Sequence, residues 1–302
     1  MIILTSGNKY LDIDGYASGI AYRELLKLQG IKAKFISTAS PNSSVPKSLL
    51  SLQLGLDNYN LSKDDKFIIL DLSNKAFFER FVIEENIIEL IDHHSGFEEY
   101  WQEKLGDKSI IESIGSVATI IFEKYEENDL LNKMSKDIAK LLMAAILDNT
   151  LNFTAKITTK RDYLAYQKLE DISKDNNFKA DYFRECQEYI ENNLIDSIFN
   201  DLKIEVTNDF LPNVLGQLII WDITSILERL TEIKNALNKY NDWIMNIVSL
   251  KENKSYIICS SKEVLTKLNE LFNSEAKDEI IIVEPAILRK EIIKKSFLYC
   301  NK

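Results

Sequence analysis

Short β-rich runs alternate with helical segments through the first half of the chain, and this alternation limits the fold more than any other feature. Strands are predicted at 2–5, 33–36, 66–70 and 87–91, and helices at 16–29, 116–126, 135–147 and from behind Thr158-Thr159 to 169. Strands joined by crossover helices run parallel, because the helix returns the chain to the starting edge of the sheet. The alternation therefore predicts a mostly parallel sheet with helices on both faces.

The second half of the chain contains another series of strands and helices. Strands are predicted at 202–206, 217–220, 243–250, 256–259 and 279–283, with helices at about 224–238 and 262–272. A polar, highly charged segment at 174–193 precedes them, and we expect the domain boundary there. The predicted fold is α/β, with a first domain at 1–187 and a second, smaller α/β domain at 193–302.

Composition excludes several classes of protein. The chain has 37 Lys and Arg residues against 47 Asp and Glu, a net charge of −10, and 45% hydrophobic residues, which excludes disorder. An acidic chain without a basic run is a poor partner for nucleic acid or an anionic membrane. No apolar run approaches the roughly 20 residues that span a bilayer. The three cysteines are far apart, and the N-terminus shows no leader. We expect a soluble cytoplasmic protein; its oligomeric state stays open, a homodimer included.

Carboxylates follow predicted strand and helix ends at several places. Asp12 and Asp14 follow the first strand, Asp71 ends the strand at 66–70, and Asp148 closes an apolar helical stretch. Each could instead cap a helix or form a turn. However, a carboxylate at the carboxyl end of a buried parallel strand points into the crevice where such sheets bind ligands. An unpaired buried carboxylate such as Asp148 would also be costly.

The chain has only two histidines, and they are adjacent in Asp92-His93-His94, directly after the strand at 87–91. Alone, adjacent histidines in a loop are consistent with chance solvent exposure. Together with the carboxylates they indicate a site for Mn²⁺, Co²⁺ or Mg²⁺, which accept carboxylate and imidazole ligands. Two such ions sharing a bridging carboxylate form the usual clamp for attack at phosphorus.

The motifs follow one another in a specific order. They are Gly7-Asn-x-x-x-Asp12-x-Asp14, Ile69-Leu-Asp71, Asp92-His93-His94, Gly115-Ser-Val-Ala-Thr119, Ala145-Ile-Leu-Asp148, Asp201-Leu-Lys203 and Ile287-Leu-Arg289-Lys290. This series resembles the DHH phosphoesterase superfamily over nearly the whole chain. It is most similar to the branch with a DHHA2-type second domain, which comprises manganese-dependent (family II) inorganic pyrophosphatases, exopolyphosphatases and prune-like proteins.

The resemblance implies a role for each matched residue. One metal ion would be held by Asn8, Asp12 and Asp71, and a second by Asp14, Asp71, His93 and Asp148, with Asp71 bridging the two. Asp92 would be the outer carboxylate that fixes the histidine tautomer. His94, Lys203, Arg289 and Lys290 would bind the phosphates, and the catalytic set would be Asp71, His94, Lys203 and Arg289. Without the resemblance, these lysines and the arginine would be interpreted as solvated surface residues.

The resemblance implies a two-metal hydrolase in which hydroxide activated by Mn²⁺, Mg²⁺ or Co²⁺ attacks pyrophosphate or short-chain polyphosphate. The motif around Asp148 favours pyrophosphate, whereas Asn8, where pyrophosphatases typically carry histidine, favours polyphosphate and greater use of Mg²⁺. Gly15, where serine is frequent, resembles the DHH nucleases, but the chain has no third histidine for their second domain. The alternatives are a phosphodiesterase acting on cyclic nucleotides or very short oligonucleotides, and a catalytically weak, prune-like binding or regulatory protein.

Overall fold

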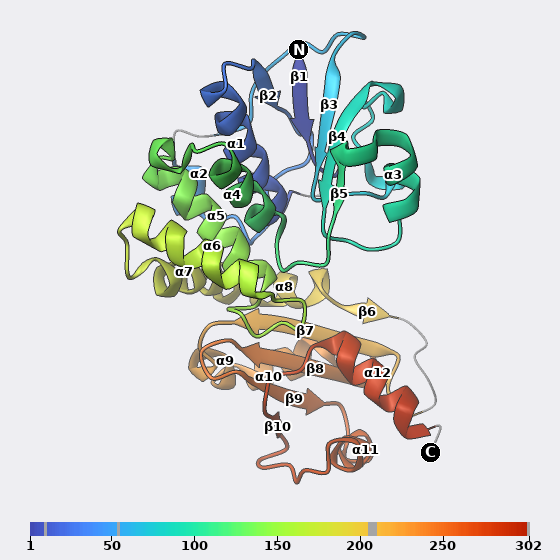
Figure 1. Ribbon diagram of the computed structural model, residues 1–302. Coiled ribbons are helices and arrows are strands. Elements are labelled where there is room, and N and C mark those ends of the chain that lie inside the picture. Colours follow the sequence, from blue (N-terminus) through green and yellow to red (C-terminus); the bar gives the residue numbers. More distant parts are fainter. Residues whose placement is uncertain (9–10, 53–54, 205–209, 301–302) are drawn as a thin grey trace. The chain divides into compact units, whose positions relative to one another are not determined.

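Two β-sheets, each covered by helices, belong to two units of the chain, Met1–Tyr182 and Phe183–Lys302 (Figure 1). The structure is a computed structural model that describes residues 1–302 except 9–10, 53–54, 205–209 and 301–302, and except the side chains of Lys290 and Cys300.

The division between the units falls inside helix α7 (Phe178–Asn192), so the charged segment expected at the boundary is helical. Phe178, Tyr182 and Phe183 are buried, and their spacing gives this polar helix one apolar face. The domain limits at 187 and 193 stay a prediction.

The sheet of the first unit is entirely parallel. Its strands are β1 (Ile2–Thr5), β2 (Ala33–Phe35), β3 (Lys66–Leu70), β4 (Ile87–Asp92) and β5 (Ser109–Ile111), in the order β2-β1-β3-β4-β5. The predicted mostly parallel sheet is confirmed, and β5 adds an edge strand that the sequence pattern did not predict. All strands of this sheet therefore end at the same edge.

Helices cover both faces of this sheet. The helices of this unit are α1 (Ile13–Leu28), α2 (Lys47–Leu50), α3 (Glu98–Leu105), α4 (Val117–Glu127), α5 (Lys136–Asn149) and α6 (Lys160–Ser173), with 3-10 turns at Lys75–Phe77, Glu84–Asn86, Gly106–Lys108 and Leu131–Lys133. The helices α1, α3 and α4 pack on the sheet, whereas α5 packs on α1 and α4, and α6 packs on α4 and α5. Figure 1 shows α1 and α4 on one side of the sheet and α3 on the other. Trp101 of α3 packs on Phe67 and Ile69 of β3. The helix predicted to start behind Thr158-Thr159 is α6, and Thr159 caps it in a capping box with Asp162.

The second unit contains a smaller mixed sheet. Its elements are α8 (Leu194–Asn200), β6 (Lys203–Ile204), β7 (Val214–Ile220), α9 (Thr224–Leu227), α10 (Leu230–Leu237), β8 (Trp243–Ser249), β9 (Lys254–Cys259), α11 (Lys262–Phe272), β10 (Ile281–Val283) and α12 (Arg289–Cys300). The strand order is β10-β9-β8-β7-β6, with β7 and β8 parallel and the other pairs antiparallel. The predicted second α/β domain is confirmed. The strand predicted at 202–206 lies partly outside the described residues.

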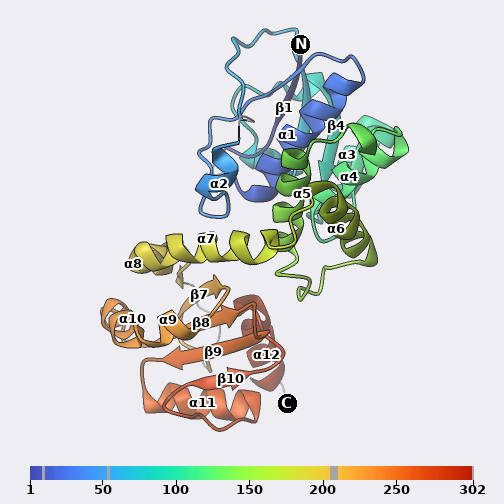
Figure 2. The ribbon, with the colours of Figure 1, turned by 90° about the vertical axis from the view of Figure 1, so that its left-hand side faces the viewer.

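Apolar side chains alternate between the two faces of the second sheet. Leu218 and Ile247 pack with α8, α9 and α10, whereas Leu215 and Ile244 pack with α11 and α12. Figure 2 shows α9 and α10 on one side of this sheet and α12 on the other. The helix predicted at 224–238 is divided into α9 and α10, and α12 was not predicted. Among the described residues, no helix is long and apolar enough to cross a bilayer.

Candidate metal centre

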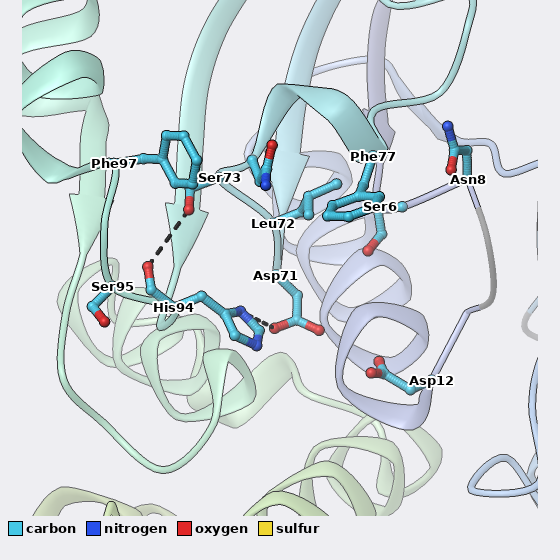
Figure 3. Close-up of a pocket in the computed structure, with 12 residues that line it drawn as sticks. Ser6, Asn8, Asp12, Asp71, Leu72, Ser73, Phe77, His94, Ser95 and Phe97 are labelled. Atoms are coloured by element: carbon cyan, nitrogen blue, oxygen red, sulfur yellow. Dashed lines mark hydrogen bonds and ion pairs between the residues drawn. The ribbon is translucent and has the colours of Figure 1, made fainter. Parts of the chain in front are cut away.

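The carboxyl ends of β1, β3 and β4 bring several of the predicted site residues to one edge of the first sheet. Asp71 directly follows β3, and His93 and His94 follow β4. A pocket of about 420 Å³ lies at this edge and is lined by Asp71 and His94, together with Asn8 and Asp12 after β1 (Figure 3). Parallel α/β sheets bind ligands at this position because helix N-termini and loops converge there.

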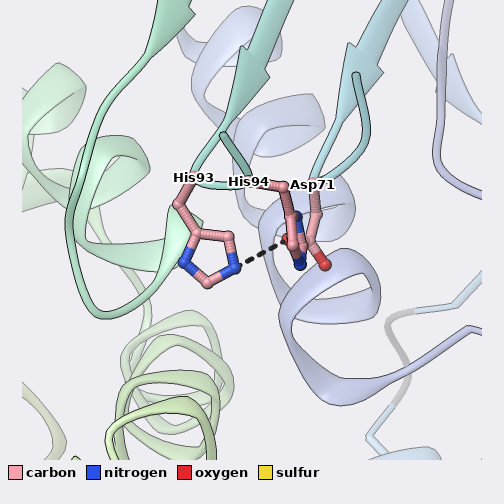
Figure 4. A group of neighbouring side chains, drawn as sticks. All are labelled: Asp71, His93 and His94. Carbon is pink, nitrogen blue, oxygen red and sulfur yellow. Dashed lines mark ion pairs between the residues drawn. The ribbon is translucent and has the colours of Figure 1, made fainter. Parts of the chain in front are cut away.

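Asp71, His93 and His94 form a close group of possible ligand atoms at this edge (Figure 4), with one atom of each lying within 4.8 Å of the others. Nε2 of His93 is 3.3 Å from Oδ1 of Asp71 and 4.0 Å from Oδ2 of Asp14. Oδ1 of Asp71 is buried, and its contact with His93 is an ion pair only when the imidazole is protonated. When the ring is neutral this oxygen has no donor, which is costly for a buried carboxylate, and a divalent cation that bound the oxygen together with the imidazole nitrogen would satisfy it. The residues therefore fit a metal ion.

The two histidines are oriented by different groups. Nδ1 of His93 lies 3.0 Å from the carbonyl oxygen of Ile114, to which it can only donate, so its Nε2 presents a lone pair towards Asp71 when the ring is neutral. Nδ1 of His94 lies 2.8 Å from Oδ1 of Asp92. This contact occupies the ring nitrogen of His94 nearest Asp71 and leaves Nε2 for another partner. The side chain of His94 is 63% exposed, which suits contact with a substrate.

Asp14 is fully buried and joins α1 to α4. Its carboxylate accepts hydrogen bonds from Oγ of Ser116 at 2.9 Å and from the backbone N–H groups of Val117 and Ala118 at 2.9 and 3.0 Å. These donors form the capped N-terminus of α4, which favours a negative charge. At the neighbouring Gly15, a Cβ atom would lie only 2.8 Å from Oγ of Ser6. Ser6 therefore occupies the space that a serine side chain at position 15 would require.

Asp148 and Asp12 complete the group of carboxylates. Oδ1 of Asp148, in the last turn of α5, accepts a hydrogen bond from Oη of Tyr182 at 3.0 Å. Asp12 is the N-cap of α1, and its Oδ1 accepts from the backbone N–H of Gly15 at 3.0 Å. The structural interpretation of Asp12 as a helix cap is thus correct, although the residue also lines the pocket.

The pKa values show the electrostatic cost of this arrangement. Burial, together with the nearby charge of Asp12, raises the pKa values of Asp14 and Asp71. Burial also raises the pKa of Asp148 to about 7. Burial lowers the pKa of His93, but its hydrogen bond to Asp71 and the charges of Asp71 and Asp14 outweigh this effect and raise it to about 10. A bound divalent cation would offset this cost, because its positive charge favours the ionised form of the clustered carboxylates.

Asn8 is not brought into this group. Its Nδ2 donates a hydrogen bond to the carbonyl oxygen of Phe78 at 2.7 Å. In Figure 3 the amide is turned away from Asp71 and Asp12, although the residue lines the same pocket. Metal ligation by Asn8 stays a prediction and would require its side chain to rotate.

The predicted phosphate-binding residues lie in the second unit. Arg289, at the start of α12, bonds through Nη2 to Oδ1 of Asp201 at 2.9 Å, and through Nη1 to the carbonyl oxygens of Asp201 and Leu215. Lys203 in β6 pairs with Leu215 of β7. Leu215 therefore brings Lys203 and Arg289 to the same end of the second sheet. The side chain of Lys290 lies outside the described residues. The phosphate-binding roles stay predictions.

Three contacts of this site were not foreseen: the carbonyl of Ile114 on His93, the cap by Ser116 on Asp14, and the hydroxyl of Tyr182 on Asp148. The motif Gly115-Ser-Val-Ala-Thr119 indicates the start of a helix, and this motif is the sequence signal that points to Ser116. The other two had no signal, because a backbone carbonyl is common to every residue and Tyr182 lies outside every motif.

Comparisons with known proteins agree with this description. Residues 2–146 match the family model described as the DHH family, N-terminal domain. The chain is 25% identical over 307 aligned positions to the manganese-dependent inorganic pyrophosphatase of Methanothrix thermoacetophila, covering 96% of this chain and 95% of that protein.

Two solved structures share the fold. A protein of Methanococcus jannaschii assigned to the family II inorganic pyrophosphatases superposes with a TM-score of 0.60 at 18% identity, covering 98% of this chain and 99% of the other. An exopolyphosphatase-related protein of Bacteroides fragilis gives a TM-score of 0.54 at 15% identity, covering 99% and 91%. The strand-end aspartates and the Asp92-His93-His94 motif lie within residues 2–146, the part of the chain that matches the N-terminal domain of the DHH family.

Proposed function

We propose that the protein is a two-metal-dependent hydrolase of phosphoanhydride bonds that acts on inorganic pyrophosphate or short-chain polyphosphate. The observation that carries this proposal is the buried Oδ1 of Asp71, which lies 3.3 Å from Nε2 of His93, beside Asp14, and lacks a donor when His93 is neutral. Relatives that match over nearly the whole chain are named manganese-dependent inorganic pyrophosphatases, and this supports Mn²⁺ as a cofactor. The mixed carboxylate and imidazole ligands also suit Mg²⁺ and Co²⁺.

We assign the metal ligands as the resemblance implies. Asn8, Asp12 and Asp71 would hold one ion, and Asp14, Asp71, His93 and Asp148 the other. Bound ions would offset the negative charge of the carboxylates and phosphates and lower the pKa of a coordinated water. The buried donors on Asp14 and Asp148 support this assignment, since groups that orient a ligand commonly tune its metal affinity.

His94 is proposed to contact the substrate rather than a metal ion. Asp92 accepts a hydrogen bond from its Nδ1 at 2.8 Å, so its Nε2 donates to a phosphate oxygen only when the ring is protonated. Arg289 would hold a phosphate by a fork of two N–H groups, while Lys203 and Lys290 would supply point charges. In the net reaction, the oxygen of water bonds to phosphorus as the bridging P–O bond breaks, and two phosphate products share the protons of the water.

A phosphate-release assay tests this function. Pyrophosphate, tripolyphosphate and longer polyphosphate would each be supplied with Mn²⁺, Mg²⁺ or Co²⁺, and with EDTA as the metal-free control. We expect release from at least one of these substrates with metal and none with EDTA. The relative rates decide between pyrophosphate, favoured by the Asp148 motif, and polyphosphate, favoured by Asn8.

The same experiment distinguishes the alternatives. Hydrolysis of a cyclic nucleotide or a dinucleotide, without phosphate release from any anhydride, would identify a phosphodiesterase. Thermal stabilisation by metal without turnover of any phosphate compound would identify a binding or regulatory protein.

A further inference from the structure

The hydroxyl of Tyr182 lies between the end of α5, which carries the proposed metal ligand Asp148, and the loop that contains Ser44. Its Oη is 3.0 Å from Oδ1 of Asp148 and 3.0 Å from the carbonyl oxygen of Ser44. Both neighbours are acceptors, so the single proton of the hydroxyl is shared between the two contacts. Tyr182 is only 3% exposed, and its ring stacks on Phe178 of the same helix. Its hydroxyl is therefore held in place by packing.

The loop that contains Ser44 continues this network to the start of α1. Oγ of Ser44 accepts a hydrogen bond from the backbone N–H of Ile13 at 2.9 Å and donates one to Oδ1 of Asn42 at 2.6 Å. Ile13 is the first residue of α1 and stands between Asp12 and Asp14. Tyr182 thus contacts the end of α5, which carries Asp148. It also contacts the loop whose Ser44 accepts a hydrogen bond from Ile13, between Asp12 and Asp14.

The contact with Asp148 restricts how this carboxylate can bind a cation. A carboxylate whose Oδ1 accepts from a fixed donor can no longer rotate freely, and its remaining lone pairs keep one direction. Tyr182 acts in this way across a separation of 34 residues in sequence. It lies outside all motifs of the family resemblance.

We propose that Tyr182 is a positioning residue that fixes the carboxylate of Asp148 in the orientation that binds a divalent cation. This inference rests on the metal-binding role given to Asp148 under the proposed function. Tyr182 is not among the metal ligands or phosphate-binding residues assigned above, so its proposed effect passes through Asp148.

The Tyr182→Phe variant tests the proposal, because it removes one oxygen atom and retains the ring that packs on Phe178. The affinity for Mn²⁺ is measured by equilibrium dialysis, independently of turnover. We expect Mn²⁺ to bind about 10–100-fold more weakly, as is typical when a group that orients a metal ligand is lost. Unfolding in EDTA shows that the variant folds without metal.

Tyr125→Phe is the matched control. Tyr125 is 1% exposed and donates a hydrogen bond to the carbonyl oxygen of Ala21 at 2.8 Å, so its replacement removes a buried hydrogen bond from the same unit. We expect this variant to lose some stability in EDTA and to keep the Mn²⁺ affinity of the wild type. The Asp148→Asn protein, with and without Tyr182→Phe, completes a mutant cycle. The second substitution is expected to have no further effect on Mn²⁺ affinity there.

Equal Mn²⁺ affinity in folded Tyr182→Phe, Tyr125→Phe and wild-type protein would overturn the proposal. A further loss of affinity on adding Tyr182→Phe to Asp148→Asn would also overturn it, because Tyr182 would then act by another route. Failure of the proposed function has a different signature: the wild type would bind Mn²⁺ but release no phosphate, and the affinity series would still decide the role of Tyr182.

Discussion

Replacing Asp71 by asparagine tests whether one carboxylate organises the metal centre. The substitution keeps the shape of the side chain and removes its negative charge. Asp71 has a φ of 58°, a left-handed conformation that asparagine tolerates as readily as aspartate. Its backbone N–H, which donates to the carbonyl of Ile91 at 2.8 Å, is unchanged. The backbone therefore gives no reason for the variant to lose stability.

The expected size of the effect follows from mass action. At 100 times its Kd, Mn²⁺ adds about 2.7 kcal/mol to the unfolding free energy of the wild type. Losing a direct ligand should weaken binding at least as much as losing a group that orients one, about 100-fold, so the variant gains only about 0.4 kcal/mol at the same concentration. In a domain the size of Met1–Tyr182, each kcal/mol shifts Tm by about 2–4 °C. The Mn²⁺-induced shift should fall from about 5–11 °C to about 1–2 °C.

Without metal, two effects oppose each other. Burial and the charges of Asp14 and Asp12 raise the pKa of Asp71, so its ionised form costs stability at neutral pH, whereas its pair with protonated His93 contributes stability. Asparagine removes both, and we expect Asp71→Asn in EDTA at pH 7 to be about as stable as the wild type. A variant that is unstable in EDTA would show that Asp71 supports the fold itself.

Thermal unfolding measured in EDTA and across a Mn²⁺ titration decides the question. Asp107→Asn, which changes an exposed aspartate of the same unit, controls for the loss of one charge and should keep the wild-type shift. If Asp71→Asn retains the full Mn²⁺-induced shift, Asp71 is not a metal ligand and the reasoning fails.

Three further predictions concern metal preference, substrate binding and pH. Asn8→His should raise the ratio of Mn²⁺- to Mg²⁺-supported phosphate release, since imidazole is the softer ligand; an unchanged ratio counts against metal ligation at position 8. Lys203→Ala and Arg289→Ala should keep the Mn²⁺-induced thermal shift while phosphate release falls and KM rises; loss of the shift would show that these cations support the metal site instead. In EDTA, the unfolding free energy should fall by about 2 kcal/mol between pH 5 and 7. Burial raises the pKa of Asp148 to about 7 from 3.8, so the folded state binds the extra proton and loses stability as that proton dissociates. Urea titrations would show this slope flattened in Asp148→Asn.

Local sequence patterns determined the secondary structure and the positions of the acidic residues. The strands Ile2–Thr5 and Lys66–Leu70 and the helix Lys262–Phe272 have the predicted bounds, because apolar periodicity and flanking polar residues depend only on neighbours in the chain. The same local logic put Asp71 at the end of a buried strand. Parallel strands end at one edge, so the sequence also implied that these end residues would converge.

Only the tertiary structure decided which groups contact one another. The partner of Asp14 is Ser116, 102 residues away, and that of Asp148 is Tyr182. Asn8 donates to the carbonyl of Phe78 instead of facing Asp71. Arg289 is held by Asp201. These choices depend on strand order and on competition among donors and acceptors that are distant in sequence, and no local pattern carries that information.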